Sequence, residues 1–271
     1  MSVFFLFLLG LTLGILTTLF WIPEKDLGRG YFQLNALIVL ALLSLAVAVD
    51  RLHPMEPFGS HGKQGLLALG TALVSAFGYY AAVWREQWRW ARLPAGIAVI
   101  ATTVVLVLSG SALTIARTPL PHRPVLLNLS LVSCALLLGW SLVNMLLGHW
   151  YLISPKLTFR YLIAFCRALV ALVLLRWLAV GVTLATALSV DSMIEPHPWR
   201  LLVDFGGQGM FFWFRLVWGL AVPLLLAFMA LHCARNRSNQ SATGILYVLV
   251  MGTFIGEITA LYLTLTTGVP V

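Results

Sequence analysis

Three ionisable residues lie inside apolar stretches of the sequence, and their types suit proton transfer or ligand binding. Glu257 lies within Gly252–Leu261, while Arg176 and Arg215 lie in two other apolar stretches. A charge at bilayer depth is costly, so it needs a partner and is functional by default. Quinone reduction needs protons at both carbonyl oxygens, and a carboxylate is a suitable carrier. We therefore expect Glu257 to be catalytic and to form a quinone-binding site with Arg176 and Arg215.

Two histidines at the ends of apolar stretches offer a second chemistry. His149 and His232 fall on the same predicted side of the membrane, and a b-type haem needs axial ligands at similar depth on facing helices. Haem b bound by this pair is therefore an alternative cofactor to quinone. The segment Gly148–Tyr151 is also typical of an aromatic belt at the membrane surface. His149 is also a further quinone-binding candidate, on the opposite side from Glu257, Arg176 and Arg215.

The composition identifies the elements that must position these residues. Of the 271 residues, 61% are hydrophobic and 10% are charged, against about a quarter charged in a soluble domain. This excludes a soluble enzyme, a disordered chain and a disulfide-stapled secreted domain. The net charge of +8 is typical of basic loops at a lipid surface rather than of nucleic-acid binding. We predict an all-α polytopic membrane protein in a lipid bilayer.

The cysteines and the motifs narrow the chemistry further. The three cysteines, Cys134, Cys166 and Cys233, are far apart, and an iron–sulfur cluster needs about four thiolates. We expect no metal site other than the alternative haem. Fingerprints of phosphate-binding loops, dinucleotide sites, zinc proteases and serine hydrolases are also missing from the sequence. We therefore expect no iron–sulfur cluster held by this chain.

Apolar runs separated by proline, glycine and charge clusters predict eight transmembrane helices. A span needs about 20 apolar residues. The predicted spans are 3–22, 32–50, 64–84, 95–116, 125–148, 161–188, 210–232 and 244–267. The sixth loop is the longest, and its segment 196–205 is expected to form a short helix at the membrane surface.

Basic residues in the loops predict the orientation. The odd-numbered loops hold nine of them, which are Lys25, Arg29, Arg85, Arg89, Arg92, Lys156, Arg160, Arg235 and Arg237. The even-numbered loops hold five, which are Arg51, Lys63, Arg117, Arg123 and Arg200. Lys and Arg are enriched in cytoplasmic loops. We expect an inner-membrane protein with both termini on the outer, periplasmic side.

The two halves of the sequence resemble each other in an ordered series of short matches. Ile22, Lys25 and Arg29 in the first loop recur with the same spacing as Ile153, Lys156 and Arg160 in the fifth. Further matches pair 8–13 with 137–142, 49–50 with 190–191, 91–92 with 234–235, and 109–113 with 257–261. Four spans per half make the repeats parallel. We predict two four-helix bundles, residues 1–124 and 125–271.

The repeat indicates where a site should lie. Glu257 aligns with Ser109, and Arg167, Arg176 and Arg215 lie within spans of the second half. The first half has no charge inside a span, because Asp50 is at a boundary. The second bundle is therefore expected to carry the buried charges and any chemistry.

This architecture resembles the membrane anchor of molybdopterin oxidoreductases, the NrfD and DMSO-reductase anchor type. The segment Gly256–Tyr262 is similar to the Gly-Glu…Tyr ending of that family's last span, with a different tyrosine spacing, and Ser238–Tyr247 looks like a family signature. The resemblance implies a quinone or quinol site. It also implies partner subunits with iron–sulfur clusters or haems, and other membrane subunits.

Three classes of function are compatible with the sequence. The first is a membrane subunit of a respiratory electron-transfer complex, in which Glu257 carries a proton and Arg176 and Arg215 position the ring. The second is a transporter or channel with a polar site between the repeats, for which Pro223 would kink the seventh span. The third is a structural subunit in which buried ion pairs only hold helices together.

Overall fold

The computed structural model describes residues 3–21, 23–52, 62–111, 123–154, 157–189, 200–205 and 207–271. Within these ranges the chain forms helices and no strand. In chain order they are α1 (Val3–Thr18), α2 (Glu24–Leu27), α3 (Arg29–Leu52), α4 (Gly62–Trp84), α5 (Trp88–Ser111), α6 (Arg123–Ile153), α7 (Arg160–Ser189), α8 (Arg200–Val203), α9 (Gln208–Leu216), the π-helix η3 (Val217–Ala221), α10 (Val222–Arg235) and α11 (Asn239–Thr267).

The long helices have the length and composition of membrane spans. In the described part of the chain, 7 helices are long and apolar enough to cross a membrane. They correspond to the second to eighth predicted spans, with α9, η3 and α10 forming the seventh. The prediction of an all-helical, multi-pass membrane protein agrees with this finding. Residues 112–116 of the predicted fourth span lie outside the described residues.

The helix found in the first predicted span, 3–22, is shorter than predicted. Helix α1 has 16 residues and ends at Thr18, where turn hydrogen bonds from Leu19 N to Leu16 O and from Trp21 N to Thr18 O follow. Such a helix is about 24 Å long, below the roughly 30 Å of a hydrocarbon core. Residues 5–16 are all buried, so α1 is a central core helix that is apolar on every side.

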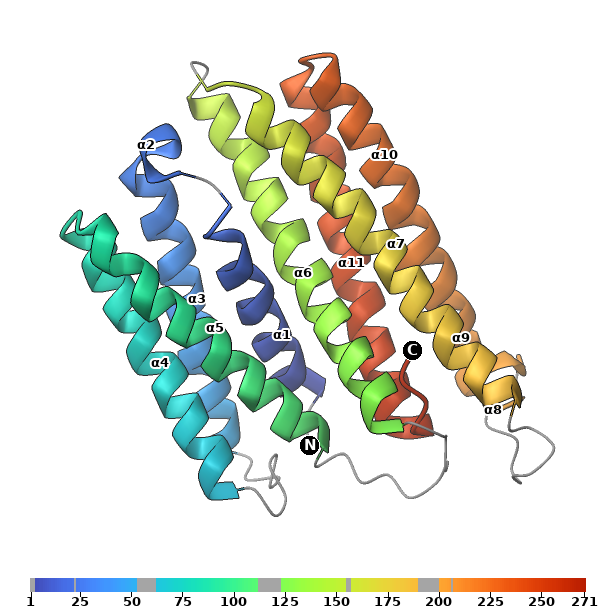
Figure 1. Ribbon diagram of the computed structural model, residues 1–271. Helices are drawn as coiled ribbons and strands as arrows, with labels where there is room; N and C mark the ends of the chain where they lie inside the picture. The colour runs from blue at the N-terminus through green and yellow to red at the C-terminus, as the bar shows by residue number, and fades with distance from the viewer. Residues whose placement is uncertain are drawn as a thin grey trace.

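The helices of the two halves lie on opposite sides of a central pair. Figure 1 shows α3, α4 and α5 on one side, α7, α10 and α11 on the other, and α1 beside α6 between them. In the first half the packed neighbours are α1 with α3, α3 with α4, α4 with α5 and α5 with α1. In the second half they are α6 with α7, α7 with α10, α10 with α11 and α11 with α6.

Small residues let the two central helices approach closely. A Cβ on Gly14 would lie 2.1 Å from the Ala135 oxygen and 2.7 Å from the Gly139 Cα. One turn earlier, Gly10 faces Ala135 at ordinary contact distance. The spacing of Gly10 and Gly14 is that of close helix pairs in membranes, and here it is matched by Ala135 and Gly139.

Polar side chains also join the halves near these helices. The indole Nε1 of Trp140 donates to Thr17 Oγ1 at 3.0 Å, and Trp150 Nε1 donates to the Leu27 oxygen at 3.2 Å. The Tyr161 hydroxyl donates to Asp26. These bonds fix α6 and α7 to the first-half residues beside them.

The seventh span is irregular next to its proline. The π-helical turn Val217–Ala221 lies between α9 and α10, and Pro223 is the second residue after it. Proline lacks the N–H that would bond four residues back, and a wider turn is one way to accommodate it. The irregular turn begins two residues after Arg215, so it affects how that side chain is placed.

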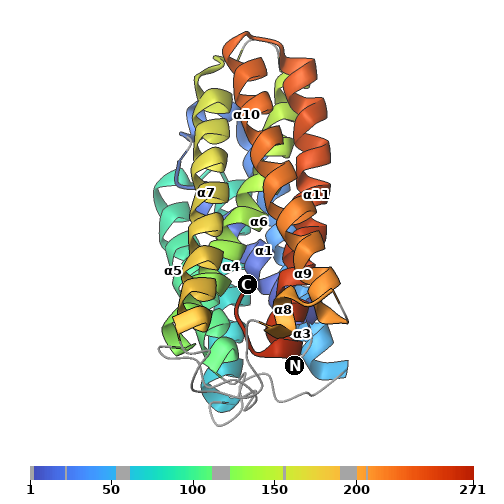
Figure 2. The same cartoon turned by 90° about the vertical axis from the view of Figure 1, so that its right-hand side faces the viewer.

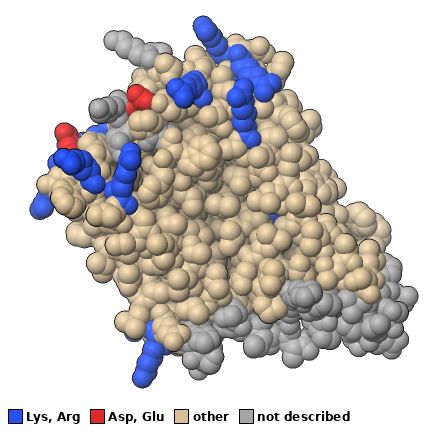
Figure 3. Space-filling model, viewed as in Figure 1, with Lys and Arg blue, Asp and Glu red and all other residues tan. Residues whose placement is uncertain are grey.

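The described odd-numbered turns lie at the end of the molecule opposite the two termini. The two termini lie at one end in Figure 1, and Figure 2 shows the short helix α8 at that end too. Helix α8 lies inside the segment 196–205 where a surface helix is predicted; residues 196–199 are outside the described part. At the opposite end, Lys and Arg gather on the face seen in Figure 3. Lys156 and Arg117 lie outside the described residues.

Candidate intramembrane charged site

The predicted charged residues lie on the buried sides of three helices, and their side chains meet there. Arg176 lies on the buried face of α7 in register with Val173 and Ala179, at the 3–4-residue spacing of a helix face. Glu257 likewise follows Thr253 on the buried face of α11. Arg215 is in the last turn of α9. The side chains of Arg176, Arg215 and Glu257 are 1%, 0% and 0% exposed, so none reaches solvent.

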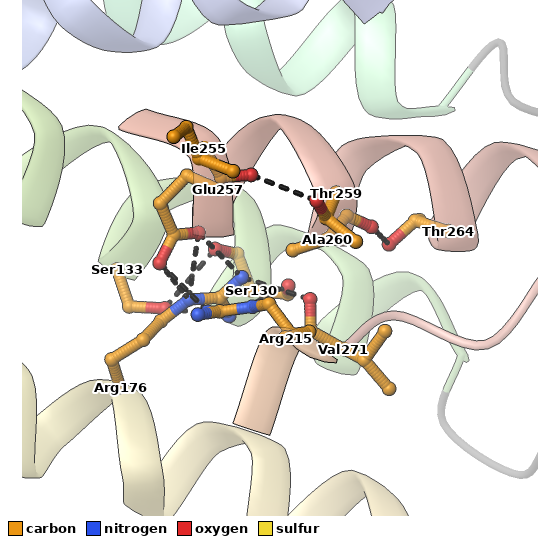
Figure 4. Close-up of polar contacts among 10 residues, drawn as sticks. All are labelled: Ser130, Ser133, Arg176, Arg215, Ile255, Glu257, Thr259, Ala260, Thr264 and Val271. Atoms are coloured by element: carbon orange, nitrogen blue, oxygen red, sulfur yellow. Dashed lines mark hydrogen bonds and ion pairs between the residues drawn. The ribbon is translucent and has the colours of Figure 1, made fainter. Parts of the chain in front are cut away.

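Both arginines bind the carboxylate of Glu257 (Figure 4). Arg176 donates from Nη2 to Oε2 at 2.9 Å, and its Nε lies 3.1 Å from Oε2 and 3.2 Å from Oε1. Arg215 donates from Nη2 to Oε1 at 2.7 Å. Each carboxylate oxygen therefore accepts from at least one guanidinium group, which is the strong, charge-assisted kind of hydrogen bond.

Arg176 is further held by α6 and by the last residue of the sequence. Its Nη1 donates to Ser130 Oγ at 2.9 Å and lies 3.5 Å from Ser133 Oγ. Its Nη2 also donates to the backbone oxygen of Val271 at 2.9 Å. Every nitrogen of this guanidinium has an acceptor, so Arg176 is fixed in one position.

Arg215 is packed tightly but bonded less completely. Its Nη1 lies 2.6 Å from the position of a Cβ on Gly219 and 3.3 Å from that of a Cβ on Gly256. The two glycines themselves touch, because a Cβ on Gly219 would lie 2.7 Å from the Gly256 Cα. In the described part of the chain, Nε and Nη1 of Arg215 have no hydrogen-bond partner. These two nitrogens are therefore buried donors whose hydrogen-bonding capacity is not used within the described part of the chain.

The cluster has an uneven charge balance. Two guanidinium groups face one carboxylate among these three side chains. Buried charges are tolerated when they are paired and hydrogen-bonded. The Val271 oxygen is a further acceptor on Arg176, so Nε and Nη1 of Arg215 are the guanidinium nitrogens of this cluster left without an acceptor in the described part of the chain. The arrangement can thus hold an ionised carboxylate and stabilise a polar group next to it.

The other candidate residues lie away from this cluster. His149 is exposed on α6, and its Nδ1 is 3.4 Å from the Tyr247 hydroxyl. His232 is exposed on α10, with Nε2 2.9 Å from Asn236 Nδ2. Helices α6 and α10 are diagonal neighbours, each packed on α7 and α11. Arg167, expected within a span, is exposed on α7.

Ser130, Ser133 and the Val271 oxygen complete the site, although the sequence analysis did not single them out. A signal for the serines existed, since both interrupt the apolar fifth span and lie three residues apart on one helix face. The contact of Val271 depends on how the segment after α11 folds back. Gly268 makes that turn possible, because its φ of 75° is unfavourable for other residues.

No family model matches the chain. No curated protein matches it either.

Proposed function

We propose that this chain is an inner-membrane subunit of a respiratory electron-transfer complex and that it exchanges electrons and protons with quinone or quinol. The observation that carries the proposal is the fully buried cluster of Arg176, Arg215 and Glu257. Ionisable groups at this depth mark ligand pathways and proton relays by default. Partner subunits with iron–sulfur clusters or haems, and other membrane subunits, would supply the redox centres.

The proposed architecture is a parallel repeat of two four-helix bundles, residues 1–124 and 125–271, with α1 as the short member of eight. The packing partners support this reading, because α1–α3–α4–α5 and α6–α7–α10–α11 each close a ring. The contacts between the rings are reciprocal as well. Helix α1 packs on α6 and α11, while α6 packs on α1 and α5.

In the proposed site, Arg215 positions the quinone and Glu257 handles protons. The unpartnered Nε and Nη1 of Arg215 are donors suited to a carbonyl oxygen of the ring. The carboxylate would accept or release a proton as Arg215 exchanges its bond to Oε1 for one to the quinone. Arg176 stays bound to Oε2, Ser130 and Val271, so it is a positioning residue.

The test is quinone turnover of the complex purified with its partner subunits. We expect Glu257→Gln, which keeps one hydrogen-bonding oxygen, to lose at least tenfold in turnover per assembled complex, because general acid–base groups contribute about 10²–10⁴-fold. The matched control is Glu86→Gln, which removes the same charge from an exposed residue paired with Arg29. Full turnover in Glu257→Gln would remove Glu257 from the mechanism. Purification without any redox partner would contradict the proposed class.

A second candidate is a structural subunit in which the cluster is a clamp. Its supporting observation is that both oxygens of Glu257 are already occupied by arginines. Replacing Arg176, Arg215 and Glu257 together by apolar residues distinguishes the two functions, since such a replacement of a buried ion cluster is often neutral for stability. A quinone site predicts an assembled but inactive complex. A clamp predicts that turnover survives wherever assembly does.

A transporter with a polar site between the repeats is the third candidate. The π-helical turn Val217–Ala221 beside Arg215 favours it, because irregular helix segments at charged sites are typical of transporters. Substrate uptake into vesicles containing this chain alone would support transport. Turnover that needs redox partners, without uptake, would support the quinone-linked subunit.

A further inference from the structure

Two surface grooves lie at the same end of the molecule, the end that carries the described odd-numbered turns. The α4 groove has a volume of about 270 Å³ and is lined by Phe77, Tyr80, Ala81, Trp84 and Arg85. The α10 groove has a volume of about 460 Å³ and is lined by Phe228, Met229, Leu231, His232, Cys233 and Arg235. Neither groove includes a residue of the Glu257 cluster.

Each groove combines an apolar wall with an arginine at the end of its helix. Phe77 and Trp84 are 62% and 56% exposed on α4, and Phe228 and Met229 are 50% and 44% exposed on α10. In helices that span a bilayer, such side chains face lipid. The arginine lies at the helix end, at the level where a phospholipid carries its phosphate. The order along the helix therefore matches the order of groups along a lipid.

The charge at both mouths favours an anion. Beside Arg85, the carboxylate of Glu86 is bound by Arg29 at 2.9 Å, and Arg29 also stacks 5.1 Å above the Trp84 ring. The guanidinium of Arg85 has no side-chain partner among the described residues. The same is true of Arg235, and the sequence 222–238 has no acidic residue. Basic pockets between transmembrane helices at the cytoplasmic surface of a membrane bind anionic lipid head groups.

The two grooves also occupy corresponding places in the fold. Helix α4 packs between α3 and α5, and α10 packs between α7 and α11. Both helices form the third predicted span of their half. Figure 3 shows Lys and Arg over both sides of the molecule at this end. We propose that each groove binds one anionic phospholipid, with an acyl chain against the apolar wall and the phosphate paired with Arg85 or Arg235.

Native mass spectrometry of the purified protein with added phosphatidylglycerol or phosphatidylcholine tests this proposal. Wild-type protein should retain two more molecules of phosphatidylglycerol than of phosphatidylcholine. Arg85→Gln and Arg235→Gln should each lose one, with about fivefold weaker binding at the altered groove. The double variant should lose both.

The control is Arg237→Gln, which removes a charge from an exposed residue at the same end that lines neither groove. We expect it to retain both lipids. Equal loss in Arg237→Gln would assign the preference to overall surface charge and overturn the proposal. Equal retention of the two lipids by wild-type protein would do the same, as would a double variant that binds like wild type.

Discussion

At the residue scale, Glu257 joins two arginines from different helices. Arg176 is fully bonded, whereas Arg215 keeps two buried nitrogens, Nε and Nη1, without a partner in the described part of the chain. An unsatisfied buried donor costs about 1–3 kcal/mol, more for a charged group. The imbalance between the two arginines is therefore an energetic reason for a further polar ligand at Arg215.

Removing the carboxylate should destabilise the protein more than removing the whole cluster. Glu257→Leu leaves two guanidinium groups buried without an anion, which costs about 3–5 kcal/mol. The variant Arg176→Met, Arg215→Met, Glu257→Leu leaves no buried charge from this cluster and should melt closer to wild type. Thermal unfolding in detergent measures both, with Glu86→Leu as the exposed control. A single variant as stable as the triple one would contradict the pairing.

The sequence alone predicted this cluster but not all of its contacts. Ionisable residues in apolar stretches must find partners, so Arg176, Arg215 and Glu257 could be expected to meet. The roles of Ser130 and of the Val271 oxygen depend on helix rotation and on the turn at Gly268, which no spacing rule specifies. His149 was predicted as a further quinone-binding candidate on the opposite side from this cluster, and it lies exposed beside Tyr247.

At the element scale, contacts between glycines set the distances between helices. Gly14 meets Gly139 where α1 crosses α6, and Gly219 meets Gly256 where η3 crosses α11. Without side chains at these points, the backbones pack in direct contact, which is how helices associate when lipid supplies no hydrophobic driving force. The second crossing also packs directly against the Arg215 side chain.

Widening the α1–α6 crossing should weaken the fold. A Cβ at position 139 would lie 2.1 Å from the Gly14 carbonyl carbon, so Gly139→Ala must move backbone. Overpacking of this kind costs about 1–3 kcal/mol. The control Gly181→Ala adds a methyl group where nothing lies within 4 Å. A lower melting temperature is expected for Gly139→Ala only; equal melting temperatures would argue against a tight crossing.

Changing the η3–α11 crossing should disturb the charged site. The added methyl of Gly219→Ala would lie 2.6 Å from Nη1 of Arg215. We expect its effect on stability to depend on Glu257, with a coupling of about 0.5–3 kcal/mol in a double-mutant cycle with Glu257→Gln. Gly244→Ala on α11 has open space around its new methyl and should show no coupling. Additive effects of Gly219→Ala and Glu257→Gln on stability would show that the helix crossing and the charged cluster are energetically independent.

The apolar pattern of the sequence predicted the positions of the helices better than it predicted their lengths. Seven of the predicted spans correspond to helices of spanning length, because a run of apolar residues between charges suits a bilayer whatever its neighbours. The first run, 3–22, gives only the 16-residue α1. An apolar run has the same pattern whether it faces lipid or the protein core, so sequence could not predict that α1 is enclosed.

At the scale of the whole molecule, the described basic turns and the termini occupy opposite ends. The turns that follow α4 and α10 lie at the end where Lys and Arg gather in Figure 3. The proposed orientation places this end in the cytoplasm and the termini in the periplasm. The closed ring of contacts in each half supports the repeat that this topology requires.

Thiol labelling of intact cells tests the orientation. Cys134, Cys166 and Cys233 are first replaced by alanine, and single cysteines are then introduced at exposed positions. A membrane-impermeant maleimide should label Leu52→Cys, near the proposed periplasmic end, and should label Ser238→Cys only after the cells are opened. The reverse pattern would invert the proposed topology while leaving the buried cluster unchanged.

The central claim is that quinone binds beside Arg215 and Glu257. Its most direct test is photolabelling of the purified complex with azido-substituted short-chain benzoquinone and naphthoquinone, followed by peptide mapping. We expect label on the segments around Arg176, Arg215 and Glu257. Excess unmodified quinone and the substitution Arg215→Met should each reduce the amount of this label. Label confined to other helices, or label at the cluster that excess quinone does not reduce, would contradict it.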